Sequence, residues 1–267
     1  MIDTLFCLGN ILSIAAEQDM PLTTLETMEI SISDEIALIT LTRDNALNAM
    51  NSDFFHAFQN ALKLISSDEN VKALIITGCG NGFSVGADLK NLPVNDDLDL
   101  GKSLRENFVP MVAGLKSLPF PTIAAVNGYA AGAGMGLMLA CDFTIAAKSA
   151  QFVQAFINIA LVPDAGSSYF LPRLIGRARA SEMMMLGENV SAEEAQQIGL
   201  IYKMVDDDLL MNQANDLAKK LKKKSTSTLM QIRKLLDSSF ENSLENQLEE
   251  EAKAQQIAGK TKNFIEG

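Results

Sequence analysis

Apolar and polar positions alternate in short stretches near the start of the chain. Residues 28–32 and 36–42 alternate or run apolar, and the polar residues 33–35 separate them. This pattern predicts a β-hairpin or two adjacent strands. Residues 71–77 form a short continuous apolar run, which predicts a further strand.

A helix is predicted between the hairpin and this strand. Asn51, Ser52 and Asp53 are residue types that cap helix N-termini. Large apolar residues then recur at helical spacing as far as about Ser67, namely Phe54, Phe55, Phe58, Leu62 and Ile65.

Strands and helices continue to alternate along most of the chain. The pattern predicts strands at residues 121–126, 143–147 and 202–205, and helices at 104–118, 167–175, 178–186 and 192–197. This order predicts an α/β fold with mostly parallel pairing, and the strandless end predicts a helical region. We divide the chain into an N-terminal extension (1–27), a core (28–206) and a helical C-terminal region (207–267).

Composition narrows the classes of function. The 267 residues are 48% hydrophobic and 21% charged, as in ordinary globular proteins, and the net charge is −11. This charge disfavours nucleic acid and anionic membranes as partners. The single histidine, His56, weakens any histidine-based metal site or triad, and we expect no metal. Residues 1–20 lack the basic flank of a signal peptide and are too short to span a membrane, so we expect a cytoplasmic protein.

Two loops rich in glycine and alanine are the strongest candidates for chemistry. Each follows an apolar strand, at residues 78–88 and 127–134, and the second opens into the short apolar segment 135–140. Small residues let another molecule approach the backbone, and a helix N-terminus offers free N–H groups. Two converging N–H donors would form an oxyanion hole, which stabilises negative charge on a carbonyl oxygen.

Phosphate-binding readings of these loops are weaker. A dinucleotide fingerprint requires G-x-G-x-x-G, but Leu137 stands where the third glycine of the series from Gly132 belongs. No Gly-Lys-Ser/Thr sequence follows either loop, so the P-loop pattern is absent.

The motifs resemble those of the crotonase superfamily, the enoyl-CoA hydratases and isomerases. The two loops carry N-G-F-S-V-G-A-D-L-K at 81–90 and N-G-Y-A-A-G-A-G at 127–134. Supporting motifs are N-A-L-N-A at 45–49, L-V-P-D-A-G at 161–166, L-P-R-L-I-G at 171–176 and S-A-E-E-A at 191–195. The resemblance covers residues 28–266 and implies an α/β spiral of ββα units with a helical C-terminal region. It also implies a homotrimer or hexamer built through residues 207–267.

The resemblance implies an acyl-CoA thioester as substrate and no prosthetic group. The thioester oxygen would lie between the backbone N–H groups of Ala87 and Ala133. The residues expected around the coenzyme A portion are Ala49, Val85, Ala87, Asp88, Leu89 and Lys90. Lys90 could reach a phosphate, although an exposed lysine is the more common case. Candidates for the acyl pocket are Phe83, Phe108, Met111, Leu115 and Phe156, and core packing explains each of them equally well.

The sequence departs from the resemblance at the catalytic acids. The related hydratases place one glutamate at the position of Gly136 and another at the position of Phe156. Asp164 remains, and it matches the acid of a subset of isomerases that use a single aspartate. One carboxylate can remove a proton from one carbon and return it to another, and burial raises its pKa and makes it a stronger base.

Several alternatives stay open. Asp164 could instead cap the following helix, and Asp88 and Asp142 are expected to be structural. The protein could be a hydratase with a relocated acid, or a non-catalytic relative that binds acyl-CoA or RNA. A dehalogenase would need a histidine near the first loop, and His56 lies on a predicted surface helix well before it. Residues 219–224 form a basic cluster. The simpler interpretation is a solvated helix face, and the alternative is a phosphate contact.

Overall fold

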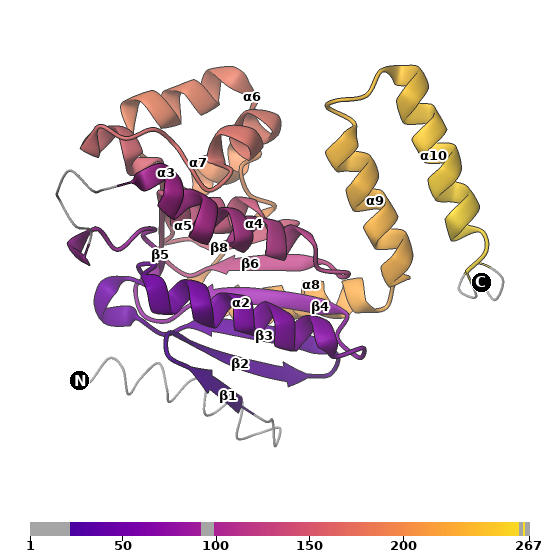
Figure 1. Cartoon of the computed structure of the whole chain (residues 1–267), viewed down its shortest axis with the longest axis horizontal. Helices are drawn as coiled ribbons and strands as arrows, with labels where there is room; N and C mark the ends of the chain where they lie inside the picture. The colour runs from indigo at the N-terminus through magenta and orange to yellow at the C-terminus, as the bar shows by residue number, and fades with distance from the viewer. Residues whose placement is uncertain (1–21, 92–98, 262–263, 265–267) are drawn as a thin grey trace.

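The computed structural model describes residues 22–91, 99–261 and 264 of the chain. Its larger sheet has seven strands in the order β1-β2-β3-β4-β6-β8-β11 (Figure 1). Their bounds are β1 Leu22–Leu25, β2 Met28–Ser33, β3 Ile36–Leu41, β4 Ala73–Gly78, β6 Thr122–Val126, β8 Phe143–Ala147 and β11 Lys203–Val205. The first three strands are antiparallel and every later pairing is parallel, which confirms the predicted hairpin and parallel core.

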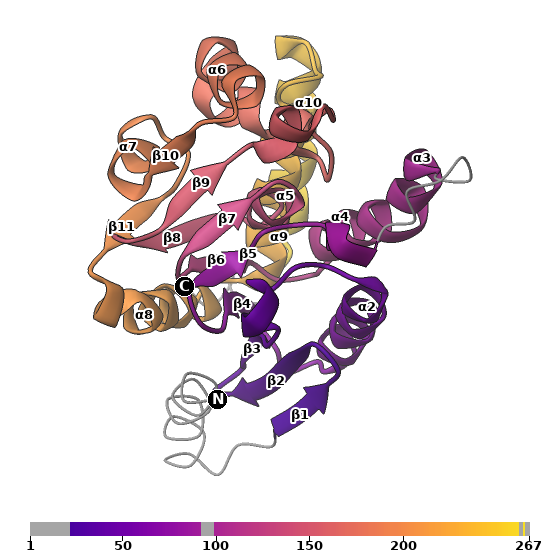
Figure 2. The ribbon, with the colours of Figure 1, turned by 90° about the vertical axis from the view of Figure 1, so that its left-hand side faces the viewer.

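A second sheet of four strands lies beside the first, in the order β10-β9-β7-β5 (Figure 2). Each of its strands has three residues: β5 Gly82–Ser84, β7 Tyr129–Ala131, β9 Gln151–Val153 and β10 Asn189–Ser191. The chain contributes β4 and β5, then β6 and β7, then β8 and β9, so that successive pairs add one strand to each sheet. This repetition is the expected spiral of β-β-α units.

Helices cover both faces of the larger sheet. Helix α2 (Ser52–Ser67) and helix α4 (Val109–Lys116) lie on one face, and α8 (Leu210–Lys222) lies on the other (Figure 2). The sequence predicted one helix over residues 104–118. The structure instead has the short helix α3 (Leu100–Ser103), a π-helical segment at Leu104–Phe108 and then α4.

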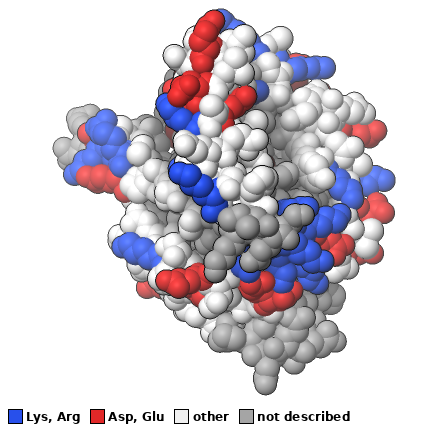
Figure 3. All heavy atoms as spheres, turned by 90° about the vertical axis from the view of Figure 1, so that its right-hand side faces the viewer, with Lys and Arg blue, Asp and Glu red and all other residues white. Residues whose placement is uncertain are grey.

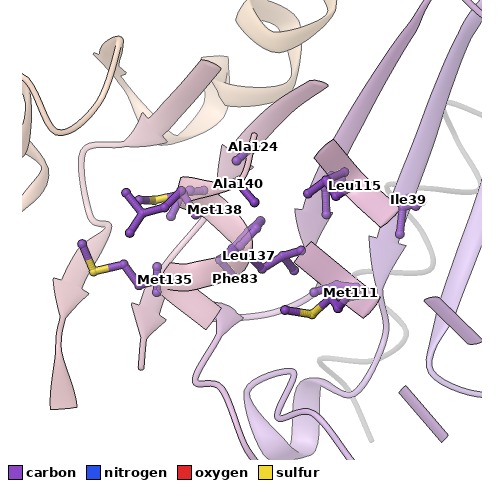
Figure 4. Packing of buried hydrophobic residues seen from close by; sticks show 14 of the residues in the cluster. Ile39, Phe83, Met111, Leu115, Ala124, Met135, Leu137, Met138 and Ala140 are labelled. Atoms are coloured by element: carbon purple, nitrogen blue, oxygen red, sulfur yellow. The ribbon is translucent and has the colours of Figure 1, made fainter. Parts of the chain in front are cut away.

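The main core lies between the sheets and helices α2, α4 and α5 (Ala133–Leu139). Figure 4 shows Phe83 and Leu137 packed together, with Met111 and Leu115 from α4 beside them. All seven residues of α5 are buried, so the second loop opens into a helix inside the protein. Helix α5 is therefore held on all sides by packing, and the loops pack against it.

Four more helices lie above the larger sheet or to its right in Figure 1. They are α6 (Ser167–Leu186), α7 (Ala192–Gln197), α9 (Thr226–Ser238) and α10 (Leu244–Ala258). Helix α6 is interrupted by non-helical dihedral angles at Gly176, which matches the two helices predicted there. Helices α9 and α10 run side by side, away from the larger sheet.

The larger sheet extends beyond the expected start of the core. The core was expected to begin at residue 28, but β1 pairs with β2 from Leu22 to Leu25, so the sheet already begins at Leu22. The polar Thr23 and Thr24 obscure this edge strand in the sequence. The rest of the expected extension, residues 1–21, lies outside the described part of the chain. Among the helices that the structure describes, none has the length and apolar character required to cross a membrane.

Candidate active site

The sheets bring the two glycine-rich loops to one edge. Strands β4 and β6 are parallel neighbours, and the short strands β5 and β7, which follow them, are also parallel neighbours. Because carboxyl ends of parallel strands share one edge of a sheet, the segments after β4 and β6 lie side by side. This edge is where ligands bind in many open parallel sheets.

Glycines allow the loops to touch. An added Cβ at Gly128 would lie 2.0 Å from the carbonyl oxygen of Asn81, and one at Gly134 would lie 2.1 Å from that of Ser84. No real Cβ fits at such distances. The two loops therefore pack backbone against backbone, and side chains larger than hydrogen are excluded from the contact.

Ala87 and Ala133 lie on either side of this contact. Met50 donates to the carbonyl oxygen of Gly86 at 2.7 Å and accepts from the N–H of Asp88 at 3.0 Å. In this parallel bridge the N–H of Ala87 points away from Met50. Ala133 is the first residue of α5, where backbone N–H groups lack a partner within the helix.

The two N–H groups are suited to hold an anion. Gly86, which precedes Ala87, has a φ of 82°, and an added Cβ would lie 2.7 Å from the nitrogen of Ala133. Neither N–H group donates to an acceptor among the residues that the structure describes. Two neighbouring donors without acceptors, one at a helix N-terminus, have the composition of an oxyanion hole.

A second close contact brings Asp164 to the same helix. An added Cβ at Gly136 would lie 2.6 Å from both the Cβ and the carbonyl oxygen of Ala165. Gly136 follows Ala133 by three residues, which is about 4.5 Å along a helix axis. The turn that carries Asp164 therefore lies about one helical turn from the Ala133 donor.

The environment of Asp164 suits a base. Its Oδ1 atom is buried and has no hydrogen-bond partner among the described residues. Burial raises the pKa of Asp164 from the ordinary value of 3.8 to about 6. At neutral pH the carboxyl group is therefore ionised but more basic than a solvated aspartate, which favours proton transfer near pH 7.

The structure does not support the capping role for Asp164. The N-cap residue of α6 is Gly166, and no side chain caps that end of the helix. The interaction of Asp164 with α6 runs through its backbone, because its carbonyl oxygen accepts from the N–H of Ser167 at 2.9 Å. The carboxylate of Asp164 therefore does not take part in capping α6.

The two positions that would carry hydratase acids are closed. Gly136 has no room for a side chain beside Ala165. Phe156 is 7% exposed, and its ring lies 3.7 Å from the position that a Cβ on Gly132 would occupy. The aromatic ring thus covers the backbone just before Ala133, and it brings no acid to the donors.

The residues expected around coenzyme A divide into buried and exposed members. Ala49 is buried, whereas Leu89 and Lys90 are exposed. Arg43 links the two groups, because it donates to the carbonyl oxygen of Ala49 and pairs with Asp88 at 2.8 Å. This hydrogen bond from Arg43 holds the pKa of Asp88 below its ordinary value, in keeping with the expected structural role.

Val85 belongs to the same first loop and is half-buried. Its N–H donates to the carbonyl oxygen of Leu47 at 3.1 Å. The structure therefore brings the expected coenzyme-binding residues of 85–90 into one segment, anchored on residues 43–50. Arg43 was missed by the sequence analysis, since a lone arginine 45 positions from Asp88 gives no local signal.

Asp142 is also structural. It accepts hydrogen bonds from Arg233, at 2.7 Å from Nε to Oδ1 and through Nη2 to Oδ2. Arg233 donates further to the carbonyl oxygens of Leu118 and Phe120, each at 2.8 Å. One arginine of α9 therefore ties the C-terminal region to the end of α5. The distance of 91 positions between the partners hid this pair from sequence analysis.

The remaining candidates lie apart from the donors or within the core. The main buried cluster contains Phe83, Met111 and Leu115, which Figure 4 labels, and also Phe108, so packing accounts for all four. His56 is exposed on α2. No group of three or more His, Cys, Asp or Glu side chains able to hold a metal ion occurs among the residues described.

A cavity of about 660 Å³ lies between α6, α8 and α9. Its walls are mostly apolar and include the Arg233–Asp142 pair, but Ala87, Ala133 and Asp164 do not line it. The cavity could hold a ligand, but the two unpaired N–H donors and the Asp164 carboxyl group with its raised pKa lie at the loops. We therefore place the candidate active site at the loops.

The basic cluster at residues 219–224 is partly engaged within the chain. Lys222 donates to the carbonyl oxygen of Asp34 at 2.9 Å and pairs with the carboxylates of Asp34 and Glu35. On the face shown in Figure 3, Lys and Arg side chains stand beside Asp and Glu side chains. These contacts favour the solvated helix face over the phosphate contact.

Comparison with known proteins agrees with this arrangement. Residues 31–267 match the family model described as enoyl-CoA hydratase/isomerase. The chain is 40% identical over 235 residues to 1,2-epoxyphenylacetyl-CoA isomerase of Escherichia coli, covering 87% of this chain and 90% of that protein. It is 33% identical over 238 residues to 2,3-dehydroadipyl-CoA hydratase of the same species, covering 89% and 92%.

A crystal structure of enoyl-CoA hydratase from Bacillus anthracis superimposes with a TM-score of 0.81 at 31% identity, covering 94% of each chain. The chain belongs to the enoyl-CoA hydratase/isomerase family and has the crotonase fold. Enzymes of this family act on coenzyme A thioesters without a prosthetic group.

Proposed function

We propose that this protein is an acyl-CoA isomerase that shifts a double bond within an enoyl thioester. The observation that carries the proposal is the buried, unpartnered Oδ1 atom of Asp164, in a turn that packs against α5 through Ala165. The N-terminal residue of α5, Ala133, supplies one of two unpaired N–H donors. A base next to an oxyanion hole is the minimum required to move a proton through an enolate.

The reaction has two proton transfers. Asp164 takes a proton from the carbon next to the thioester carbonyl, and the electron pair of that C–H bond moves to the carbonyl oxygen. The N–H groups of Ala87 and Ala133 stabilise the resulting enolate oxygen. When the electrons return, Asp164 delivers the proton to the γ-carbon, and the double bond is then conjugated with the carbonyl. No other group needs to gain or lose a proton.

A ring thioester is a second form of the same substrate class. The Escherichia coli relative is named as an isomerase of 1,2-epoxyphenylacetyl-CoA. The N–H groups of Ala87 and Ala133 could stabilise a thioester enolate in either substrate. The two substrates differ only in the acyl group, which is linear in one and a ring in the other. Asp88, Leu89 and Lys90 lie where the coenzyme A portion is proposed to bind.

Hydration is the alternative function. Its support is the name of the 2,3-dehydroadipyl-CoA hydratase relative, which is 33% identical to this chain. Against it stand Gly136 and Phe156, because neither supplies a carboxylate to hold and activate water. A hydratase would have to use Asp164 alone for both tasks.

Two substrates distinguish these functions. The protein is incubated with a 3-enoyl-CoA and, separately, with a 2-enoyl-CoA, and the ultraviolet absorbance of the conjugated thioester is followed. The isomerase proposal expects a rise from the 3-enoyl-CoA. A fall from the 2-enoyl-CoA with no rise from the other substrate would contradict it and support hydration. Flat traces together with tight thioester binding would instead support a non-catalytic binding protein.

We also propose that residues 207–267 assemble copies of the chain into a homotrimer or hexamer. No side chain of α9 is buried, although the helix presents Ile232 and Leu236 at 48% and 64% exposure. On α10, Leu244 and Leu248 are 71% and 54% exposed. Such apolar surface is typical of an interface. Sedimentation equilibrium tests this proposal, and a monomer at micromolar concentration would contradict it.

A further inference from the structure

The turn that carries Asp164 has an unusual backbone. φ is 48° at Ala165 and 81° at Gly166, so two successive residues are left-handed. Glycine adopts this conformation freely, but alanine rarely does, because its Cβ crowds the backbone. The hydrogen bond from the Ser167 N–H to the Asp164 carbonyl closes the turn at 2.9 Å. Conformations of this kind persist where their surroundings hold them and are frequent at functional sites.

The surroundings that hold this turn are on α5. A Cβ built on Gly136 would lie closest to two atoms of Ala165, its Cβ and its carbonyl oxygen, each 2.6 Å away. Gly136 is buried in the interior of a helix, where glycine is a poor helix former. Helix α5 thus lacks a side chain at the point where the turn meets it.

We propose that the contact between Gly136 and Ala165 positions the Asp164 carboxylate, an inference that rests on the proposed role of Asp164 as the base. Ala165 is bonded to Asp164, so the position of Ala165 constrains the direction of the Asp164 side chain. Gly136 lets the Cβ and the carbonyl group of Ala165 reach α5, and the small side chain of Ala165 limits how near the turn comes. Gly136 and Ala165 are therefore positioning residues, and neither has to touch the substrate.

The contact accounts for the burial of one carboxylate oxygen of the base. Ala165 is 8% exposed, and the Oδ1 atom of Asp164 is buried. A side chain at 136 would push the turn away from α5 and open the carboxyl group to water. The basicity of Asp164 therefore depends on residue 136 of α5 being a glycine, which has no methyl group.

Glycine-to-alanine substitutions test this inference. Gly136→Ala introduces the overlapping methyl group, and Gly136→Ala combined with Ala165→Gly removes one of the two overlapping atoms and frees the turn backbone. The matched control is Gly114→Ala in α4, where the added Cβ would meet only the tip of the Leu62 side chain, at 3.0 Å. Two quantities are measured: kcat and KM with a 3-enoyl-CoA, and the pKa of the Asp164 carboxyl group by carbon-13 NMR.

Gly136→Ala is expected to lower kcat at least about tenfold and to change KM less than about twofold, because misplacing a catalytic group affects the chemical step. The pKa of Asp164 should fall toward its ordinary value as water reaches the carboxyl group. The double variant should recover part of both changes, because the overlap with the backbone carbonyl oxygen at 165 remains, and Gly114→Ala should show neither. Circular dichroism identifies a variant that has lost its fold.

A Gly136→Ala variant with wild-type kcat and an unchanged Asp164 pKa would overturn the inference, as would a folded double variant that recovers nothing. These outcomes are separate from failure of the proposed function. If the wild-type protein does not isomerise the substrate, the NMR comparison still shows whether the contact sets the environment of the Asp164 carboxyl group.

Discussion

Gly86 lies against the first residue of α5, so closely that a Cβ on it would stand 2.7 Å from the backbone nitrogen of Ala133. Gly86→Ala should therefore push the first loop off the helix and separate the two proposed donors. Losing a donor of an oxyanion hole typically lowers kcat about 100-fold to 1,000-fold, and we expect a loss in that range. Steady-state kinetics with a 3-enoyl-CoA measures it.

The control for this variant is Gly199→Ala. Gly199 has a φ of 80°, close to the 82° of Gly86, and the nearest described atom that an added Cβ would meet beyond its chain neighbours is the carbonyl oxygen of Leu174, 4.0 Å away. This substitution imposes similar backbone strain without touching the loops. A similar loss of kcat in both variants would show that strain, rather than the hole, causes the effect.

The Arg233–Asp142 pair should be a large contributor to stability. The two side chains are 10% and 15% exposed, so a substitution such as Arg233→Met leaves a carboxylate largely shielded from water without its cation. Removing one partner of a buried ion pair typically costs about 3–5 kcal/mol of the free energy of unfolding. Urea denaturation measures the change. The exposed pair of Arg179 and Glu182 provides a comparison, since Arg179→Met should leave the midpoint unchanged.

The activity should depend on the ionisation of Asp164. The base acts as a carboxylate, and burial raises its pKa to about 6. The value of kcat/KM should therefore be constant above this pKa and should fall about tenfold for each pH unit below it. A pH profile between 4.5 and 8 measures the effect, and a value of kcat/KM that stays constant down to pH 4.5 would contradict the raised pKa of the base.

The same carboxyl group should lower stability at neutral pH. Its pKa is about 6 in the folded protein and near 3.8 when solvated, so the folded state binds the proton more tightly. This group therefore makes the protein less stable as pH rises from 3.8 to 6, and the full cost remains above pH 6. Allowing for partial exposure, Asp164→Asn should raise the free energy of unfolding by about 2 kcal/mol at pH 7.5.

Urea denaturation of the wild type and of Asp164→Asn at two pH values checks this expectation. The difference between the two proteins should be much smaller at pH 4 than at pH 7.5. An equal difference at both would mean that packing of the amide, rather than the charge of the carboxylate, changes the stability.

Apart from its edge strand β1, the larger sheet was readily predicted from the sequence. Runs such as 36–42 and 71–77 are long enough for their apolar character to show, and the capped helix α2 begins at Ser52, directly after the N-cap Asn51. Strand β7 was missed, because three residues within a glycine-rich loop carry no periodicity. The other strands of the small sheet, β5, β9 and β10, also have only three residues each, which is too short for a periodic pattern.

The site could be predicted only where chemistry is local. The two loops and the Pro163–Asp164 turn are continuous motifs, and the proposed roles of Ala87, Ala133 and Asp164 came from them. Arg43 and Arg233 act on residues 45 and 91 positions away, and the sequence shows nothing that joins these partners. The Gly136–Ala165 contact was likewise invisible, because a glycine in a helix indicates a close approach without naming its partner.

The kcat of Asp164→Asn with a 3-enoyl-CoA, measured as the rise in absorbance of the conjugated thioester, tests the central claim most directly. Asparagine matches aspartate in size but cannot accept the proton, so the variant should fold normally and lose at least about 100-fold in kcat. A folded Asp164→Asn variant that isomerises the thioester at the wild-type rate would contradict the assignment of Asp164 as the base.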